Sequence, residues 1–517
     1  MAKTLNLTLS PKQAASTEAW LGIAVRTLGV RRDQVALARV LKRSVDARHQ
    51  TPKVLLTVEI FVDGDQMPPE IHFDYPDVNG ATEVVIVGGG PAGLFAALRL
   101  IELGLKPVIL ERGKDVAERR RDIAQIHRGA GVDKESNYAF GEGGAGTFSD
   151  GKLFTRSKKR GDYNRALRTL VFHGASPEIL YEAHPHIGTD CLPRIIEHIR
   201  KTIIAAGGEF HFGAKVTDIE IRGGRAVGVR LGDTLVEGAA VILATGHSAD
   251  DIYEMLHARG VLLEAKPWAM GVRVEHPQAL IDRIQYHSDD MREWLPAAAY
   301  TLTAQVGGRG VYSFCMCPGG VIVPAMTDYR ECVVNGMSAS ARSSRWANAG
   351  IVTEVRESDF AHLAEEWGVL AGLKYRQQLE QHAAEIVGGG GTAPAQRLAD
   401  FVAGRISIDL PRTSYLPKAV ARRGEEWLPD YMASALRGGF KQWGSRMRGF
   451  VTNEAQIIGL ESRTSTPVRI PRDRESLQHP VVAGLYPTGE GAGYAGGIIS
   501  AALDGTRVAE MIATLTK

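Results

Sequence analysis

The stretch EVVIVGGGPAGLFAALRLIELGLKPVILER, residues 83–112, decides the fold of this chain. Its apolar run at 84–87 is typical of a buried parallel strand, and glycines 88, 90 and 93 follow in GxGxxG spacing. Gly88 permits the tight turn out of the strand, Gly90 lets the backbone approach a pyrophosphate, and Gly93 lets the next helix pack on the sheet. The pattern predicts a Rossmann-like α/β unit that binds a dinucleotide.

The residues beside these glycines extend the same motif. Pro91 and Ala92 open the predicted helix, whose free N–H groups and dipole favour a phosphate group. A second strand at 107–110 runs into Glu111 and Arg112. Glu111 is placed to accept hydrogen bonds from the adenosine ribose, and its carboxylate would repel a 2′-phosphate. This position therefore disfavours NADP and leaves NAD and FAD.

Two segments far along the chain favour FAD over NAD. The apolar segment 240–243 runs into Ala244, Thr245 and Gly246, after a stretch that alternates like an antiparallel meander with glycine turns. Near the C-terminus, LYPTGEGAGYAGG at 485–497 leads through a glycine-rich turn into a last helix. A simple NAD domain needs no such distant closing segment, whereas a long, extended flavin does.

Composition and charge narrow the possible partners. The 517 residues are 44% hydrophobic and 23% charged, enough for a large core. With 61 basic and 59 acidic residues, the net charge of +2 gives no global attraction to nucleic acid or lipid. The basic run from Arg156 to Arg160 has no interleaved aromatic residues, so we expect a solvated loop. Without a leader or an 18-residue apolar run, we expect a cytoplasmic protein with no nucleic-acid or membrane partner.

The four cysteines, at 191, 315, 317 and 332, are too sparse for a disulfide framework and lack the CxxC spacing of metal sites. We therefore expect no metal. In a regular strand over 311–317, the side chains of Cys315 and Cys317 would share one face, with Cα atoms about 6.6–6.8 Å apart, at the far edge of disulfide geometry. Thiols packed in the wall of a site are expected, and a redox-active pair is the alternative.

Several longer motifs carry a family resemblance. They are GEGGAGTFSDGKLFT at 141–155, HIGTD at 186–190, CMCPGG at 315–320, RTSTPVRI at 463–470 and GEGAGYAGGI at 489–498. With the dinucleotide motif, they make the chain resemble the glutathione-reductase-like FAD flavoproteins. Over nearly its whole length, the chain resembles a bacterial family of FAD-dependent dehydrogenases of largely unassigned substrate.

The resemblance assigns roles to the turn Gly489, Glu490 and Gly491. Related flavoproteins place Gly-Asp here to bind the ribityl chain of the flavin. Glu490 departs from that pattern because its side chain is longer by one methylene. Contact through backbone N–H groups is therefore expected more than direct contact from the carboxylate.

Two further segments would lie at the flavin ring. By the resemblance, the helix that begins at Gly496, Gly497 and Ile498 would aim its N-terminus at the pyrimidine edge, where negative charge gathers on reduction. A run of small residues would let backbone lie against a flat ring: Gly143, Gly144, Ala145, Gly146 and Thr147. Disulfide-reductase relatives carry a cysteine pair in the corresponding region, and its absence here makes that mechanism unexpected.

The chain divides into four segments on these patterns. We expect a small N-terminal α/β domain at 1–80 and the first part of the FAD-binding domain at 81–267. An α+β substrate domain would be inserted at 268–445, and the FAD-binding domain would finish at 446–517.

The flavin is the visible source of chemistry, because no GxSxG or HExxH motif occurs. We expect an FAD-dependent oxidoreductase that exchanges a hydride between non-covalent FAD and a small-molecule substrate. NADH, NADPH or an electron-donor protein would supply electrons. A flavin monooxygenase and a non-catalytic flavin-binding redox sensor or scaffold are the alternatives. The sequence assigns no catalytic residue, substrate, reaction direction or oligomeric state.

Overall fold

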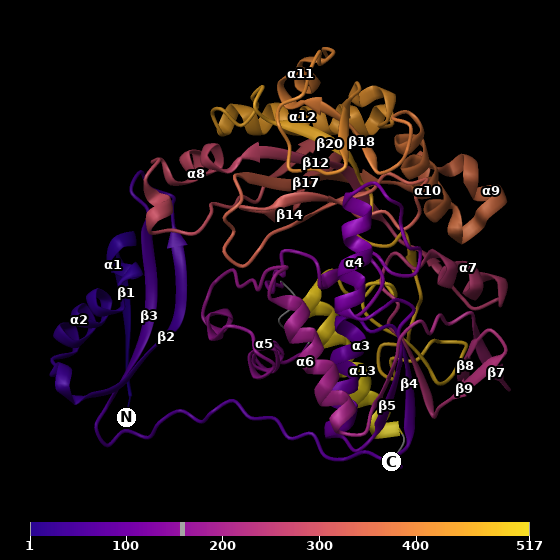
Figure 1. Ribbon diagram of the computed structural model, residues 1–517, viewed down its shortest axis with the longest axis horizontal. Helices are drawn as coiled ribbons and strands as arrows, with labels where there is room; N and C mark the ends of the chain where they lie inside the picture. The colour runs from indigo at the N-terminus through magenta and orange to yellow at the C-terminus, as the bar shows by residue number, and fades with distance from the viewer. Residues whose placement is uncertain (1, 156–160, 516–517) are drawn as a thin grey trace.

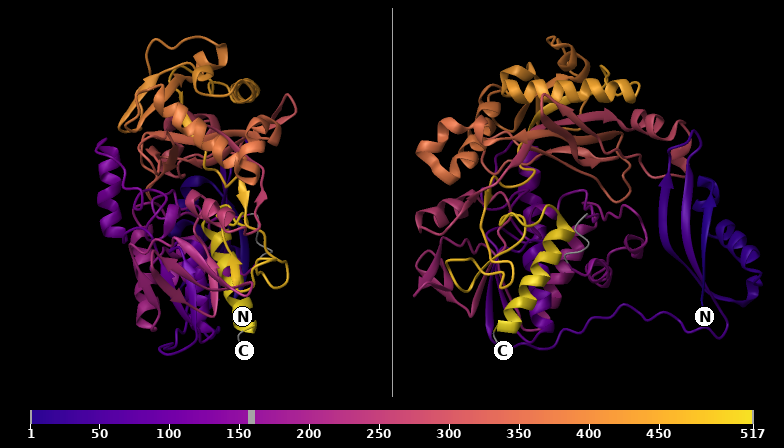
Figure 2. Two further views of the ribbon diagram at one scale, coloured as in Figure 1. Left: turned by 90° about the vertical axis from the view of Figure 1, so that its right-hand side faces the viewer. Right: turned by 180° about the vertical axis from the view of Figure 1, so that it is seen from behind.

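The computed structural model describes residues 2–155 and 161–515. A parallel-sheet domain and a second domain lie one above the other, and a small N-terminal unit stands beside them (Figures 1 and 2). An extended linker, visible along the lower edge of Figure 1, joins that unit to the parallel sheet. The basic run 156–160 lies outside the described residues.

The first domain is built on a five-stranded parallel sheet in the order β22-β10-β4-β5-β6. In that order its strands are Leu485–Pro487, Ala240–Leu243, Glu83–Val87, Lys106–Leu110 and Glu209–His211. The strand closest to the C-terminus thus pairs beside one from the middle of the chain. This return closes the domain around a long insertion.

Both faces of the parallel sheet are covered, which explains its continuous apolar strands. Val84 and Ile86 face a helical layer, and Val85 and Val87 pack on the opposite side. The helical layer contains α3 (Pro91–Glu102), α6 (Leu192–Ala205) and α13 (Ile498–Leu515). The opposite side carries β7 (Asp218–Arg222), β8 (Arg225–Leu231), β9 (Thr234–Glu237) and α7 (Asp250–Ala258).

The second domain is built on a seven-stranded sheet in the order β13-β14-β17-β12-β20-β18-β19. In that order its strands are Thr303–Val306, Arg309–Cys317, Trp346–Val355, Trp268–Pro277, Gln456–Glu461, Thr392–Arg397 and Lys418–Ala421. Its principal helices are α8 (Gln278–Tyr286), α10 (Ala371–Glu385), α11 (Leu398–Ala403) and α12 (Asp430–Arg446). All its pairings are antiparallel except that of β18 with β19.

Strand β20 corrects one expected boundary. The sequence pattern ended the inserted domain at residue 445, but β20 pairs with β12 on one side and β18 on the other. The chain therefore stays in the second domain to at least Glu461. The apolar run of β20 gave no sign of which sheet would take it, because both sheets bury such strands.

The N-terminal unit is an antiparallel sheet in the order β1-β3-β2 with two helices. Its elements are β1 (Lys3–Leu9), α1 (Pro11–Ala15), α2 (Thr17–Leu28), β2 (Val35–Asp46) and β3 (Lys53–Val62). Strand β2 contacts the first domain, where Arg43 N donates to Tyr181 O at 2.8 Å. The fold is thus of the predicted α/β class: a Rossmann-like domain, an inserted α+β domain and a small N-terminal α/β unit.

Helices α3 and α13 lie side by side on the sheet (Figure 1), and Gly505 sets how closely they approach. A Cβ atom at Gly505 would lie 2.0 Å from the carbonyl oxygen of Ala92. Backbone cannot yield as a flexible side chain can, so any side chain here forces the two helices apart.

We expect Gly505→Ala to destabilise the protein by about 1–3 kcal/mol, the usual cost of overpacking. Chemical denaturation followed by circular dichroism measures this change. Gly22→Ala is the matched control, because Gly22 lies in helix α2 with nothing within 4 Å of an added Cβ. There the same substitution should stabilise by about 0.5–1 kcal/mol through helix propensity. A loss of stability at both positions would contradict the packing argument.

Candidate functional site

The carboxyl edge of the parallel sheet brings together three segments that are distant in sequence. Ala244 N donates to Val87 O at 2.9 Å as the chain leaves β10, and Thr488 N donates to Leu243 O at 3.0 Å as it leaves β22. The turns after β4, β10 and β22 therefore lie next to one another. Ligands of open α/β sheets bind at this edge.

The three glycines of the first turn differ in what surrounds them. Gly88 has φ +104°, and an added Cβ would lie 2.5 Å from Ala244 O. At Gly93 the Cβ would lie 2.1 Å from Gly88 O, so this glycine permits close packing of helix on strand. At Gly90 the nearest atom, Gly144 Cα, is 3.8 Å away. Gly90 alone of the three faces open space, and that space is a cavity.

This cavity has a volume of about 350 Å³. Sixteen of the residues predicted to bind cofactor line it: Gly88, Gly90, Pro91, Ala92, Glu111, Arg112, Gly144, Ala145, Gly146, Ala244, Thr245, Gly246, Glu490, Gly496, Gly497 and Ile498. The other five lie behind its wall: Gly93, Gly143, Thr147, Gly489 and Gly491. The Thr147 hydroxyl, for example, is buried and donates to Glu142 O at 2.8 Å.

Two helices begin at the cavity. The first residues of α3 and α13, Pro91 and Ile498, both line it. Helix N-termini present unpaired N–H groups and the positive end of the helix dipole. An anionic ligand such as a pyrophosphate is therefore favoured at this edge.

Glu111 is buried at 4% exposure and already engaged by backbone. Its carboxylate accepts hydrogen bonds from Gly89 N at 2.8 Å, Gly113 N at 2.9 Å and Gly141 N at 3.0 Å. A carboxylate accepts about four hydrogen bonds, which leaves room for a ribose hydroxyl. Glu111 thus both fixes the glycine-rich loops and faces the cavity.

Arg112 contributes a flat surface to the cavity wall. Its guanidinium pairs with both carboxylate oxygens of Asp251 at 2.9 Å and with Glu135 at 2.6 Å. The guanidinium carbon also lies 4.2 Å from the ring centre of Phe140. Two carboxylates therefore neutralise the charge of Arg112, and the residue lines the cavity.

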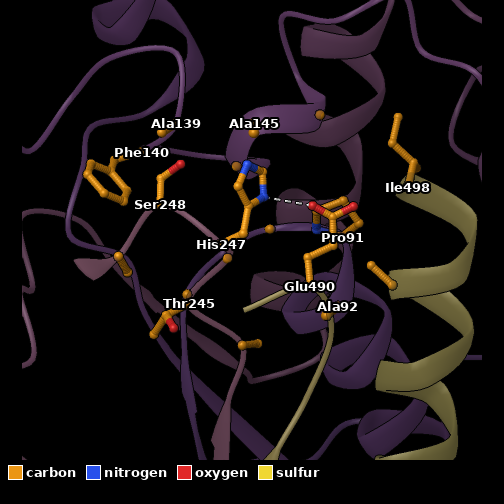
Figure 3. A pocket seen from close by; sticks show the side chains of 18 of the residues that line it. Pro91, Ala92, Ala139, Phe140, Ala145, Thr245, His247, Ser248, Glu490 and Ile498 are labelled. Atoms are coloured by element: carbon orange, nitrogen blue, oxygen red, sulfur yellow. Dashed lines mark hydrogen bonds and ion pairs between the residues drawn. The ribbon is translucent and has the colours of Figure 1, made fainter. Parts of the chain in front are cut away.

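The sequence did not identify His247, which directly follows Ala244, Thr245 and Gly246. The His247 ring lines the cavity and its Nδ1 lies 2.9 Å from Glu490 Oε2 (Figure 3). Glu490 therefore uses its longer side chain to hold an imidazole, a contact that the sequence did not predict. A histidine next to a predicted cofactor turn was the available signal, but its partner is 243 residues away.

The second domain closes one part of the cavity with residues that the sequence did not assign. Phe314 and Cys315 come from β14, and Asn335 from β16 (Val334–Met337). Arg463 also lines the cavity and is neutralised by Glu331 at 2.7 Å and Glu380 at 2.9 Å. A single cavity thus has walls from both domains.

The segment SDGK adds two charged residues to this part of the wall. Asp150 accepts a hydrogen bond from Arg342 Nη2 at 2.6 Å and another from the Ser338 hydroxyl. Burial alone would raise the pKa of Asp150, but Lys152 and Arg342 lower it overall. Lys152 lines the cavity beside it and donates to the Met316 carbonyl. Asp150 is therefore a fixed anion that ties the first domain to the second.

These features fit FAD. The open approach at Gly90 suits a pyrophosphate, Glu111 has capacity for a ribose, and small residues at 144–146 leave room for a flat ring. Two helix N-termini complement the negative charges of the cofactor. The continuation of the cavity to β14 provides the extra length that a flavin needs.

Two other kinds of site are missing from the part of the chain that the structure describes. Across residues 2–155 and 161–515, no group of three or more His, Cys, Asp or Glu side chains could hold a metal ion. Within the same ranges, no helix has the length and apolar character needed to cross a membrane.

Comparison with known families agrees with the site. Family models match residues 81–135 (FAD binding domain), 184–324 (FAD dependent oxidoreductase), 267–464 (FAD-dependent protein, C-terminal domain-like) and 1–61 (Domain of unknown function DUF8436). Three of these models describe FAD proteins, and together they cover both the cofactor motif and the second domain. The family model that matches the N-terminal unit describes a domain of unknown function.

Solved structures resemble this chain only distantly. A geranylgeranyl bacteriochlorophyll reductase-like protein of Thermoplasma acidophilum is 13% identical, covers 84% of this chain and 78% of that chain, and has a TM-score of 0.35. Glycine oxidase of Bacillus cereus is 13% identical, with 84% and 96% covered and a TM-score of 0.30. Similarities at this level support no inference about the reaction.

Curated relatives are more informative. A probable electron transfer flavoprotein-quinone oxidoreductase of Escherichia coli is 25% identical over 238 residues, 45% of this chain and 52% of that protein. An uncharacterized protein of Clostridium beijerinckii is 40% identical over 507 residues, 94% of each chain. The chain belongs to the same family as this clostridial protein and is an FAD-dependent oxidoreductase.

Proposed function

We propose that the protein exchanges a hydride between non-covalently bound FAD and a small organic substrate held against the second domain. The supporting observation is the shared cavity, which is lined by the cofactor turn at Gly90 and by Phe314, Cys315 and Asn335 of the second domain. A substrate bound against those three residues would lie in the same enclosure as the cofactor.

Bound FAD supplies hydride acceptance and donation, and the protein supplies orientation and electrostatics. The N-terminus of α13, at Ile498, offers positive potential to the negative charge of a reduced cofactor. Residues of the second domain would line the side of the cavity on which a substrate binds.

The His247–Glu490 pair is the candidate for proton transfer at this site. Glu490 engages Nδ1, so Nε2 is the ring nitrogen that a bound molecule can reach. A carboxylate that pairs with Nδ1 in this way fixes the orientation of the imidazole. We propose that this pair holds one proton near the cofactor.

The electron donor belongs to the same proposal. We propose that NADH or NADPH visits the cavity transiently, with an electron-donor protein as the other source. We propose a cytoplasmic protein. We also propose no nucleic-acid or membrane partner, because the net charge of +2 gives no global attraction to either.

The purified protein should be yellow and should release about one FAD per chain on denaturation, because no covalent attachment is proposed. Chromatography of the released cofactor checks this result. Anaerobic NADH or NADPH, added separately, should bleach the flavin, and a reducible organic substrate should restore its colour. FMN, or a flavin that remains attached to denatured chain, would refute the cofactor assignment.

The same experiment separates the alternatives. Bleaching followed by reoxidation only with oxygen and a hydroxylated product would identify a monooxygenase. A flavin that chemical reductants bleach, but that neither nicotinamide nor any screened metabolite affects, would favour a redox sensor or a donor protein. Addition of candidate donor flavoproteins would then distinguish these two.

Gly90→Val should fold normally but bind FAD at least about 100-fold more weakly, equivalent to about 2.8 kcal/mol. The reason is that its side chain would enter the cavity, where the nearest atom to a Cβ is 3.8 Å away. Flavin fluorescence titration of the apoprotein measures the affinity, and circular dichroism checks the fold. Retention of stoichiometric FAD would show that Gly90 does not face the pyrophosphate.

Gly88→Val is the contrasting variant. Its Cβ would lie 2.5 Å from Ala244 O, and its φ of +104° disfavours any side chain. This variant should lose folding and cofactor together. If both variants lost folding, or if both kept it, the separate roles assigned to Gly88 in the turn and to Gly90 at the pyrophosphate would be wrong.

A further inference from the structure

Strand β14 is irregular where it reaches the cavity. Its pairing with β17 shifts register between Phe314 and Cys317, so Cys315 and Met316 together oppose the single residue Ala349. Cys315 has φ +42°, a left-handed conformation that side-chain-bearing residues seldom adopt. The regular strand expected over these residues is therefore wrong: a β-bulge replaces it. Bulges and strained residues cluster at functional sites, where they redirect a side chain.

The bulge gives the two cysteines different surroundings. Cys315 lines the cavity, whereas Cys317 is fully buried behind it. The Cys317 thiol lies 3.4 Å from the Cys315 carbonyl oxygen, to which it donates. The Cys317 thiol therefore lies against Cys315, which is the cysteine of the pair that lines the cavity.

Positive groups surround this pair. The buried guanidinium of Arg273 donates to Cys315 O at 3.2 Å and lies 3.9 Å from Cys317 Sγ. Lys152 donates to the carbonyl of Met316, between the two cysteines. The hydrogen bond from Cys317, aided by the charges of Lys152 and Arg273, lowers the pKa of Cys315, and the pKa of Cys317 is raised. The arrangement favours a thiolate at Cys315 and a thiol at Cys317.

The other two cysteines neither line the cavity nor have these charged neighbours. Cys332 is buried, and burial raises the pKa of its thiol to about 12. Cys191 lies at the start of α6 and is absent from the cavity wall. Packing alone explains Cys332, but it does not explain a strained, cavity-facing cysteine with a thiol partner.

We propose that Cys315 and Cys317 form a redox-active dithiol that exchanges an electron pair with the FAD bound in the same cavity. The proposal rests on FAD lying against this wall, as in the proposed function. It adds a second two-electron carrier, separate from the region where disulfide-reductase relatives carry theirs.

The electrons and the proton released by the cysteine pair are all taken up by FAD. Oxidation joins the two sulfur atoms in one S–S bond, and the Cys317 thiol gives up its proton. The two electrons released, together with that proton, convert oxidised FAD to its reduced anion. In the reverse direction, reduced FAD returns the electron pair and the proton, and the S–S bond breaks to leave the Cys315 thiolate and the Cys317 thiol.

A reductive titration tests the proposal. Holoprotein is oxidised with diamide, desalted and titrated anaerobically with dithionite. Wild type should take up roughly four electrons per FAD, because a dithiol couple carries two and the flavin two. Cys315→Ser and Cys317→Ser should each take up roughly two. Cys332→Ser is the matched control and should remain at roughly four. Uptake of only two by wild type, or of four by either cavity variant, would overturn the proposal.

A second measurement does not depend on the loaded enzyme or on variant folding. Diamide-treated wild-type apoprotein is denatured, alkylated with iodoacetamide and mapped by mass spectrometry. A peptide carrying an intramolecular Cys315–Cys317 bond is expected. Alkylation of both cysteines would overturn the proposal even if the variants fail to fold.

Alkylation of native apoprotein across pH supplies a further check. Cys315 should react well below the pH at which an ordinary thiol ionises, and Cys317→Ser should move its profile, since the Cys317 thiol is its hydrogen-bond partner. If the protein binds FAD and is bleached by NADH or NADPH, yet takes up only two electrons, the proposed function stands and the dithiol proposal is wrong.

Discussion

The site depends on one constraint, the parallel arrangement of β4, β10 and β22. Parallel strands end at the same edge, so the chain leaves all three at one place, with Ala244 N bonded to Val87 O and Thr488 N to Leu243 O. The β22 pairing brings the C-terminal turn, with Glu490, to the first glycine loop. An antiparallel β22 would carry Glu490 and the start of α13 to the opposite edge of the sheet.

The same arrangement explains how a large second domain is accommodated. The chain departs after β10 and returns at β22, so the inserted sheet lies above the parallel sheet (Figure 1) and contributes residues to the cavity at its carboxyl edge. A buried pair helps to hold this insertion, since Arg273 of β12 contacts Glu461 of β20 at 2.6 Å. Arg273 also bonds Asn348 and the Cys315 carbonyl, which fixes the bulge of β14. One buried guanidinium thus connects the centre of the sheet to the cavity wall.

The sequence predicted the elements whose structure depends on residues close together in the chain. The stretch 83–112 predicted β4, α3 and β5, because the apolar run, the glycine spacing and the acid lie within one supersecondary unit. The end of the inserted domain could not be read in the same way, since the partners of β20 are β12 and β18. The cavity-facing position of Cys315 depends on a register shift against β17, and no local pattern of 311–317 encodes that shift.

The structure explains why Glu490 stands where related flavoproteins would have Asp. By the resemblance to related flavoproteins, an Asp is expected here, and the sequence instead carries an acid one methylene longer, without indicating its partner. In the structure the longer side chain reaches His247 Nδ1 at 2.9 Å (Figure 3). A shorter Asp in the same backbone position would fall short of that contact by about one C–C bond, roughly 1.5 Å. The extra methylene therefore accounts for the contact that fixes the orientation of the imidazole in the cavity.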